Sequence, residues 1–139
     1  MQMRVKNQKH LSSNLALTIH SSRRRFAARL NSGVRRSMGI EAIWKDEAGG
    51  VLGEVGDPQF LLSRFTGMAT SVQNSVCLRF LDPSGDACFN QLQIPILVQE
   101  LRHAMRNVAD PKLLAHLEKV LDLAERANAV HTYLWFMGD

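Results

Sequence analysis

The segment that most constrains the fold lies close to the end of the chain, at residues 130–137. It reads Val-His-Thr-Tyr-Leu-Trp-Phe-Met, which is rich in β-branched and aromatic side chains and has almost no polar face. A half-buried strand would alternate polar and apolar side chains, so this run is typical of a strand that is buried on both sides. The sequence therefore predicts a sheet with residues 130–137 as a central strand.

A first β-hairpin is predicted over residues 39–55, where apolar and polar side chains alternate on both sides of a turn at residues 45–50. Gly49 and Gly50 suit the turn because glycine adopts positive φ at little cost. If Trp44 pairs with Val51, one face of the hairpin forms the core side. That apolar face carries Ile40, Ala42, Trp44, Val51, Gly53 and Val55, and the outer face carries Glu41, Ile43, Lys45, Leu52 and Glu54.

A second hairpin is predicted over residues 76–92, with a strong turn signal in the sequence Asp-Pro-Ser-Gly-Asp at residues 82–86. If Leu81 pairs with Ala87, the outer face of this hairpin carries Cys77, Arg79, Phe89 and Gln91, while Asn90 faces the core. A slip of one residue would exchange the two faces, so the assignment of faces depends on the register.

Three helices are predicted from apolar residues at helical spacing. The first begins at Asp57-Pro58, a good N-cap followed by a proline that fits the first turn, and residues 70–75 are predicted to form a loop. The second runs from Pro95 to about residue 107. The third begins at Asp110-Pro111 and runs to about residue 128, with a clear amphipathic pattern.

The element order β-β-α-β-β-α-α-β predicts the fold class α+β. We expect a five-stranded antiparallel or mixed sheet, made of two hairpins and the buried C-terminal strand, with about three helices packed on one face. Residues 38–139 are long enough to form a single compact domain of this kind.

Charge divides the chain into two parts. Residues 1–37 contain nine Lys and Arg and no acid, whereas residues 38–139 contain eight Lys and Arg and all thirteen Asp and Glu, a net charge of −5. We expect residues 1–37 to be a basic, disordered extension outside the core. The overall charge of +4 therefore describes neither part.

Three interpretations of residues 1–37 fit this composition. In the first interpretation, the natural protein starts at Met38 and the upstream residues are an over-extended reading frame. In the second, the segment is a transit presequence, rich in Arg and Ser, with Phe26, Leu30 and Val34 on one helix face. In the third, it is an arm that binds nucleic acid or anionic lipid through phosphate charge. The segment is too polar to cross a bilayer, and no membrane span is expected.

Motifs of known chemistry are missing from the sequence. There is no glycine-rich phosphate loop, no nucleophile elbow and no zinc-type spacing, and the acidic turn at residues 82–86 lacks the glycine and glutamate that an EF-hand loop needs after it. The sequence thus predicts no cofactor and no metal. A small enzyme with a dispersed site stays an alternative, and its weak catalytic candidates are Glu41, Glu54, Arg79, Asn90 and His131.

The two cysteines, Cys77 and Cys88, are predicted to point to opposite faces of the second hairpin, which argues against a disulfide between them. Buried, unreactive thiols fit a reducing compartment, so we expect a cytoplasmic protein. An organellar location is the alternative if residues 1–37 are a transit presequence.

The function that fits these observations best is a small, acidic, non-enzymatic protein-interaction module. An acidic body suits a basic protein partner, as in inhibitor-like or immunity-like proteins, and makes nucleic acid an unexpected partner for residues 38–139. Self-association as a homodimer is the other version of this hypothesis. The predicted contact residues are apolar side chains on the faces assigned as outer, namely Ile43, Leu52, Cys77, Leu81 and Phe89.

Overall fold

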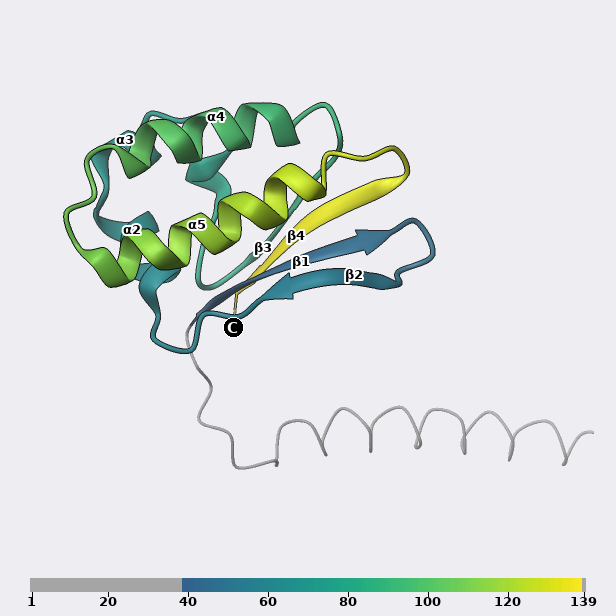
Figure 1. Ribbon diagram of the computed structural model, residues 1–139, viewed down its shortest axis with the longest axis horizontal. Coiled ribbons are helices and arrows are strands. Elements are labelled where there is room, and N and C mark those ends of the chain that lie inside the picture. The colour runs from purple at the N-terminus through teal and green to yellow at the C-terminus, as the bar shows by residue number, and fades with distance from the viewer. Residues whose placement is uncertain (1–38, 139) are drawn as a thin grey trace, which may run out of the picture. The chain divides into compact units, whose positions relative to one another are not determined.

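The computed structural model describes residues 39–138, so the predictions made for residues 1–37 lie outside the described part of the chain. The described residues form an α+β fold with one four-stranded antiparallel sheet in the order β2-β1-β4-β3 (Figure 1). The elements are β1 (Ile40–Asp46), β2 (Val51–Val55), α2 (Leu61–Met68), α3 (Thr70–Gln73), the 3-10 turn η1 (Leu78–Phe80), β3 (Asp86–Phe89), α4 (Ile94–Met105), α5 (Pro111–Arg126) and β4 (Thr132–Gly138).

The C-terminal strand β4 is central, as the sequence predicted. It pairs with β1 along its whole length, from Ile40↔Gly138 to Asp46↔Thr132, and with β3 on its other edge. Its side chains alternate between two environments: one set is buried under the helices and the other is half-buried on the opposite face. The prediction that β4 is buried on both sides is therefore correct for one side only.

The first hairpin forms where it was predicted, but its register differs by two residues. Trp44 pairs with Gly53 rather than with Val51, and the register shifts between Trp44 and Lys45. A shift of two residues keeps each side chain on its face, so Ala42 is still on the core side. The irregularity at Lys45 turns Val51 outward, and its side chain is 56% exposed instead of buried.

The predicted strand at residues 76–81 is wrong, and the sheet has four strands rather than five for this reason. The carboxylate of Glu100 on α4 accepts hydrogen bonds from the backbone N–H groups of Val76 (2.5 Å), Cys77 (2.9 Å) and Leu78 (3.0 Å). Because a side chain satisfies these donors, the segment needs no neighbouring strand and curls into η1. The second hairpin is therefore absent.

The strand β3 follows the predicted turn, in which the Asp82 carboxylate accepts from the N–H of Ser84 at 2.8 Å. It pairs with β4 and not with residues 76–81, and the pairs Cys88↔Trp135 and Phe89↔Leu134 fix its faces. Phe89 lies inside, against the ring of Phe136 at 5.8 Å between centroids, and Cys88 points out. Both faces of the predicted hairpin are exchanged here.

The two long helices agree with the sequence prediction. Asp110 caps α5 by accepting from the N–H of Lys112 at 2.9 Å, and a proline occupies the first turn of both α4 and α5. The first helix begins later than predicted, at Leu61, after Phe60 in a left-handed conformation (φ 55°). Residues 70–73 form the short helix α3 where a loop was predicted.

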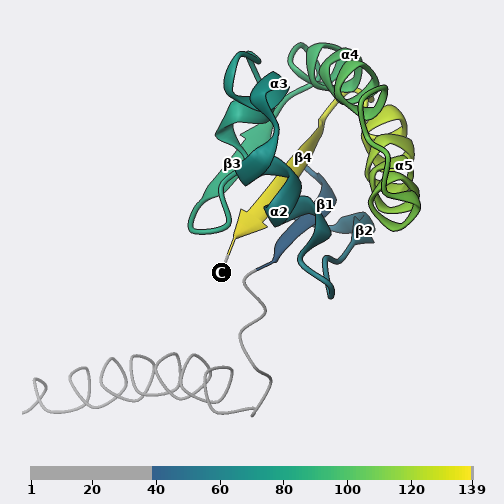
Figure 2. The same ribbon diagram turned by 90° about the vertical axis from the view of Figure 1, so that its left-hand side faces the viewer.

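All the helices lie on one side of the sheet. Figures 1 and 2 show α4 and α5 across one face, with α2 and α3 beside them, and no element of residues 39–138 across the other face. The contact is close: a Cβ added at Gly53 of β2 would lie 2.9 Å from the Leu123 Cδ1 atom of α5. The core between the layers buries aliphatic side chains from α4 and α5, each of which contributes about 1.5–3 kcal/mol.

Candidate functional site

The uncovered side of the sheet is the first candidate site, and we call it the outer face. Two rows of side chains cross it in register. One row runs Glu54, Ile43, Trp135, Cys88 across all four strands, and the next runs Glu41, Met137, Asp86 across β1, β4 and β3. A third pair, Lys45 with Tyr133, lies beyond them, and Leu52 of β2 is also outward-facing and 46% exposed.

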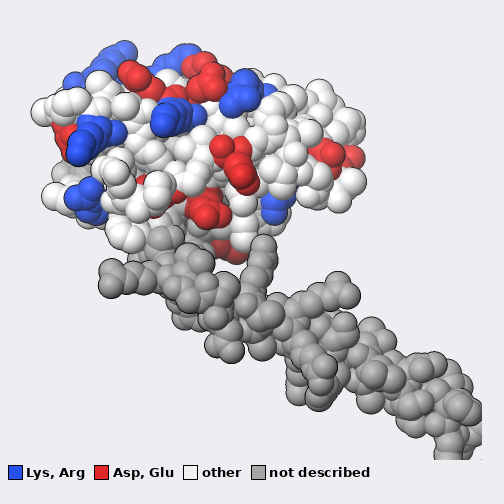
Figure 3. Space-filling view, turned by 60° about the horizontal axis from the view of Figure 1, so that its bottom comes forward, with Lys and Arg blue, Asp and Glu red and all other residues white. Residues whose placement is uncertain are grey.

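The outer face has an apolar middle and an acidic border. Ile43, Trp135 and Met137 are half-buried neighbours in the middle, whereas the carboxylates of Glu41, Glu54 and Asp86 are exposed at the sides. None of these three carboxylates forms an ion pair with another residue of the range 39–138. Figure 3, in which the underside of Figure 1 comes forward, shows red carboxylate groups separated by uncharged surface, with blue Lys and Arg groups toward its top and left.

Lys45 is the basic residue of the outer face. Its Nζ atom lies 5.5 Å from the centroid of the Trp135 ring, a distance at which the ring's electron density attracts the cation. Beside Trp135 on the next strand lies the free thiol of Cys88, which is exposed. Partial burial raises the pKa of the Cys88 thiol, and the charge of Lys45 opposes this rise.

The five predicted contact residues divide into two groups. Ile43 and Leu52 lie on the outer face, as the alternation in the first hairpin predicted. Cys77, Leu81 and Phe89 do not: each is less than 5% exposed and belongs to the core. Cys77 and Leu81 are buried because residues 76–81 form a turn held by Glu100, and Phe89 because β3 pairs with β4 in the other register.

The five candidates for a dispersed catalytic site lie on separate elements. Glu41 and Glu54 are on the outer face but are not directly opposite, since Glu54 pairs with Ile43. Arg79 lies in η1 with its guanidinium 4.9 Å from the Phe80 ring, and Asn90 accepts from the N–H groups of Leu92 and Gln93 before α4. His131 contacts Glu47 at 2.5 Å.

Of these five side chains, Glu54 alone lines the pocket of about 670 Å³ between α5 and residues 54–61, and none lines the pocket of about 580 Å³ beside α2. Asn90 and Asp82 have structural roles in turns, and the Glu47–His131 contact is exposed. Within residues 39–138, no three His, Cys, Asp or Glu side chains come close enough together to hold a metal ion.

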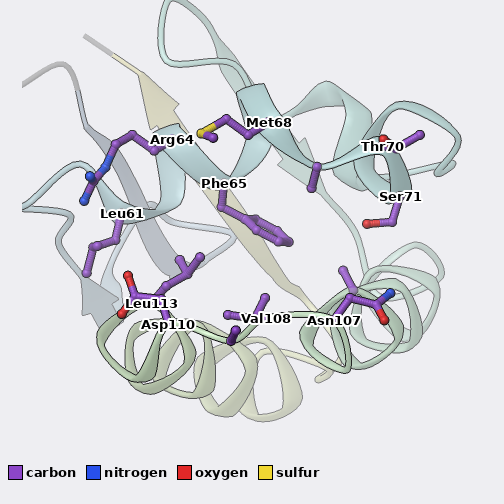
Figure 4. Close-up of a pocket in the computed structure, with 13 residues that line it drawn as sticks. Leu61, Arg64, Phe65, Met68, Thr70, Ser71, Asn107, Val108, Asp110 and Leu113 are labelled. Carbon is purple, nitrogen blue, oxygen red and sulfur yellow. The ribbon is translucent and has the colours of Figure 1, made fainter.

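An apolar pocket of about 580 Å³ lies between α2 and the connection from α4 to α5. Figure 4 shows Phe65 projecting into it from α2, with Val108 and Leu113 on the opposite wall. Arg64 lines the rim, but its guanidinium is turned toward its own backbone, where Nε donates to the Phe60 carbonyl at 3.4 Å. The pocket therefore combines an apolar wall with the polar side chains of Thr70, Ser71, Asn107 and Asp110.

A buried acid–histidine pair is the feature that the sequence analysis missed. The carboxylate of Asp57 accepts from three backbone N–H groups, those of Ile40 (3.3 Å), Leu62 (3.2 Å) and Ser63 (3.2 Å). Its Oδ1 atom also lies 3.4 Å from Nε2 of His116 on α5. The sequence indicated Asp57 as a helix cap, but its partners in β1 and α5 are too distant along the chain for any spacing rule to find.

The environment of His116 disfavours its charged form. Burial lowers the pKa of the His116 ring, the Asp57 carboxylate opposes that effect, and the charge of Lys119 adds to it. Burial also shifts the pKa of the Cys77 thiol, here upward, and the negative charge of Glu100 raises it further. In both groups the shift of the pKa favours the neutral form, as expected of buried titratable side chains.

Comparison with known proteins gives no relative from which a site could be transferred. No protein-family model matches the chain, and neither the curated proteins nor the solved structures contain a match. Over residues 39–138, no helix combines the length and the hydrophobicity needed to cross a membrane.

Proposed function

We propose that this chain is a non-enzymatic protein-interaction module that binds a basic protein partner through its outer face. The observation that carries the proposal is the composition of that face: an apolar middle of Ile43, Trp135 and Met137 with exposed, unpaired carboxylates at its sides. Apolar and aromatic anchors inside a polar border are the arrangement found in protein interfaces.

Charge supports a basic partner over a second copy of the chain. Residues 38–139 carry a net charge of −5, and Glu41, Glu54 and Asp86 border the outer face, so two copies placed face to face would bring like charges together. Lys45, the one cation among the side chains of the outer face, already lies over Trp135. Binding to a basic surface is the action expected of an inhibitor-like or immunity-like protein.

Cys88 provides a test because its exposed thiol lies beside Trp135 on the outer face, whereas Cys77 is buried and serves as an internal control. Alkylation by N-ethylmaleimide is followed by mass spectrometry in the cells that make the protein and in the purified full chain. We expect Cys88 to react at least about tenfold more slowly in cells, because a partner that binds with useful affinity shields it most of the time.

Two leucine variants locate that protection. Leu52→Ser removes an apolar group from the outer face and should restore the alkylation of Cys88 in cells. Leu92→Ser is the matched control, since Leu92 is 76% exposed in the connection before α4, and it should leave the protection unchanged. Equal alkylation rates of Cys88 in cells and in the purified chain would contradict the proposal. If the protection of Cys88 grows with the concentration of the purified chain, the outer face binds a second copy of this chain, and the proposal of a basic partner is wrong.

A further inference from the structure

A second pocket, of about 670 Å³, lies between α5 and the segment that joins β2 to α2. We call it the α5 pocket. Its helical wall carries Lys112, His116 and Lys119, which share one side of α5 because they are four and three residues apart. The opposite wall is lined by Glu54, Val55, Gly56, Pro58, Gln59 and Leu61.

His116 is the buried polar group of this wall. It is 9% exposed, and its Nε2 atom is one of two fully buried side-chain nitrogens of residues 39–138 that have no hydrogen-bond partner, the other being Nε1 of Trp44. Nε2 faces the Asp57 carboxylate at 3.4 Å, which favours a proton on that nitrogen. Among residues 39–138 no hydrogen bond to Nδ1 is seen, and the His116 side chain is one of those that line the pocket.

The charges around the α5 pocket are mainly positive. Lys112 and Lys119 form no ion pair with any residue described in the structure. Lys112 lies in the first turn of α5, where the helix dipole adds partial positive charge. The Asp57 carboxylate is already saturated by three N–H donors and is fully buried, which leaves Glu54 as the only carboxylate that lines the pocket.

We infer that the α5 pocket binds a small anion of the phosphate or carboxylate class, held by Lys112 and Lys119 and touching the His116 ring. The two lysines are about 10 Å apart along the helix axis, so they suit a ligand with two anionic groups or one anionic group on a larger body. The pocket volume is within the usual range for small-molecule sites. The pocket shares Glu54 with the border of the outer face, but its two lysines and His116 lie on α5, and the inference does not depend on the proposed function.

The neighbouring groups also give the site a direction of pH dependence. Asp57 and Glu54 are the acidic groups near His116, from the segments packed against α5, and Lys112 and Lys119 are the basic groups on its own helix. A bound anion would favour the protonated ring. Binding should therefore strengthen as the pH falls, and binding should raise the pKa of His116 from its lowered value.

The test is a titration of the isotopically labelled full chain with inorganic phosphate and, separately, with citrate, followed by NMR at constant ionic strength against sodium chloride. We expect saturable shifts at Gly56, Gln59, Ala115 and His116 with one or both anions. The double variant Lys112→Gln, Lys119→Gln should weaken binding about tenfold or more, since charge-assisted hydrogen bonds are lost. Arg106→Gln, which removes an exposed charge outside the pocket, should change nothing.

Two results would overturn the inference. One is a linear, non-saturating response of the pocket residues to both anions. The other is an equal response in the double lysine variant and in Arg106→Gln, which would show general screening of charge. Vesicles that contain phosphatidic acid form the last arm: if they bind the chain through the same lysines while free phosphate and citrate do not, the site recognises a lipid headgroup and the assignment to a free small anion is wrong.

Discussion

At the scale of single residues, Asp57 contacts three elements that are distant from one another along the chain, which no sequence spacing predicts. Its two carboxylate oxygens join the start of β1 and the start of α2, and they face His116 of α5. A fully buried carboxylate is stable only where hydrogen bonds and opposite charge replace its water. Asp57 is therefore part of the packing between these three elements as well as a helix cap.

Replacing Asp57 by asparagine should lower the free energy of unfolding by about 2–4 kcal/mol. The amide has one acceptor oxygen where the carboxylate has two, so at least one of the three N–H donors loses its partner. Urea denaturation measures the change. Asp110→Asn is the matched control, because asparagine is an equally good N-cap at an exposed helix start, and the free energy of unfolding should change by less than about 0.5 kcal/mol.

A loss no larger in Asp57→Asn than in Asp110→Asn would contradict the role given to Asp57. It would mean that α2 and β1 hold their positions without the carboxylate, and that its hydrogen bonds are easily replaced by other groups.

The lowered pKa of His116 predicts a specific pH dependence of stability. In the unfolded chain the ring has its ordinary pKa of 6.5, whereas in the folded chain burial holds the pKa lower. Between the two values the unfolded state binds more protons, so stability is fully present above pH 6.5 and is lost as the pH falls through the folded-state pKa. Urea midpoints measured from pH 8 downward should show this loss.

His116→Gln removes the titrating group and should flatten that part of the pH profile. His131→Gln removes an exposed histidine that contacts Glu47, and it should leave the loss in place. If the two variants have the same profile as the natural chain, the buried ring does not control stability in this range.

The residues of the outer face show how well the sequence predicts which side of the sheet a side chain occupies. The alternation of side chains across residues 39–55 placed Ile43 and Leu52 correctly even though the register was wrong by two, because a shift of two preserves the face. For β3 the error was a change of partner strand, which exchanged the positions of Cys88 and Phe89. Only the pairing of β3 with β4, which is a tertiary contact, decides whether Cys88 or Phe89 faces the core.

At the scale of elements, the strand predicted over residues 76–81 was the largest error. The sequence Val-Cys-Leu-Arg-Phe-Leu has strong β propensity, yet the carboxylate of Glu100 and the hydroxyl of Ser75 satisfy its backbone N–H groups and hold it as a turn. Glu100 lies more than twenty residues further along the chain, on α4. Propensity is a local quantity and cannot include such a partner. The long helices were predictable because their caps and prolines are local.

Glu100→Gln should loosen this turn while leaving the sheet intact. The amide oxygen accepts fewer and weaker hydrogen bonds than the carboxylate, so the amides of Val76, Cys77 and Leu78 should exchange with solvent at least about tenfold faster. Hydrogen exchange followed by NMR or mass spectrometry measures this, and amides in β4 should be unaffected. The thiol of Cys77 should also react faster, because the turn buries it.

Glu118→Gln is the control for that variant, since it removes one exposed carboxylate from α5. It should leave the exchange of residues 76–78 unchanged. If both variants leave these amides protected, the turn is held by the burial of Leu78 and Leu81 rather than by Glu100.

At the scale of the whole molecule, the fold places all its helices on one side of a four-stranded sheet (Figures 1 and 2). The fold class and the central position of the last strand followed from the sequence. The number of strands and the acid–histidine pair did not, because both depend on contacts between distant elements. The result is a sheet with one covered face and one apolar, acid-bordered face.

The most direct test of a basic partner on the outer face is site-specific photo-crosslinking from that face. A benzoylphenylalanine placed at Leu52 should crosslink, in the cells that make the protein, to one partner of basic isoelectric point, and high salt should reduce the yield because the border of the face is acidic. The same group at Leu92 should give no such product. Identical products from the two positions, or only dimers of this chain from Leu52, would contradict a basic partner on the outer face.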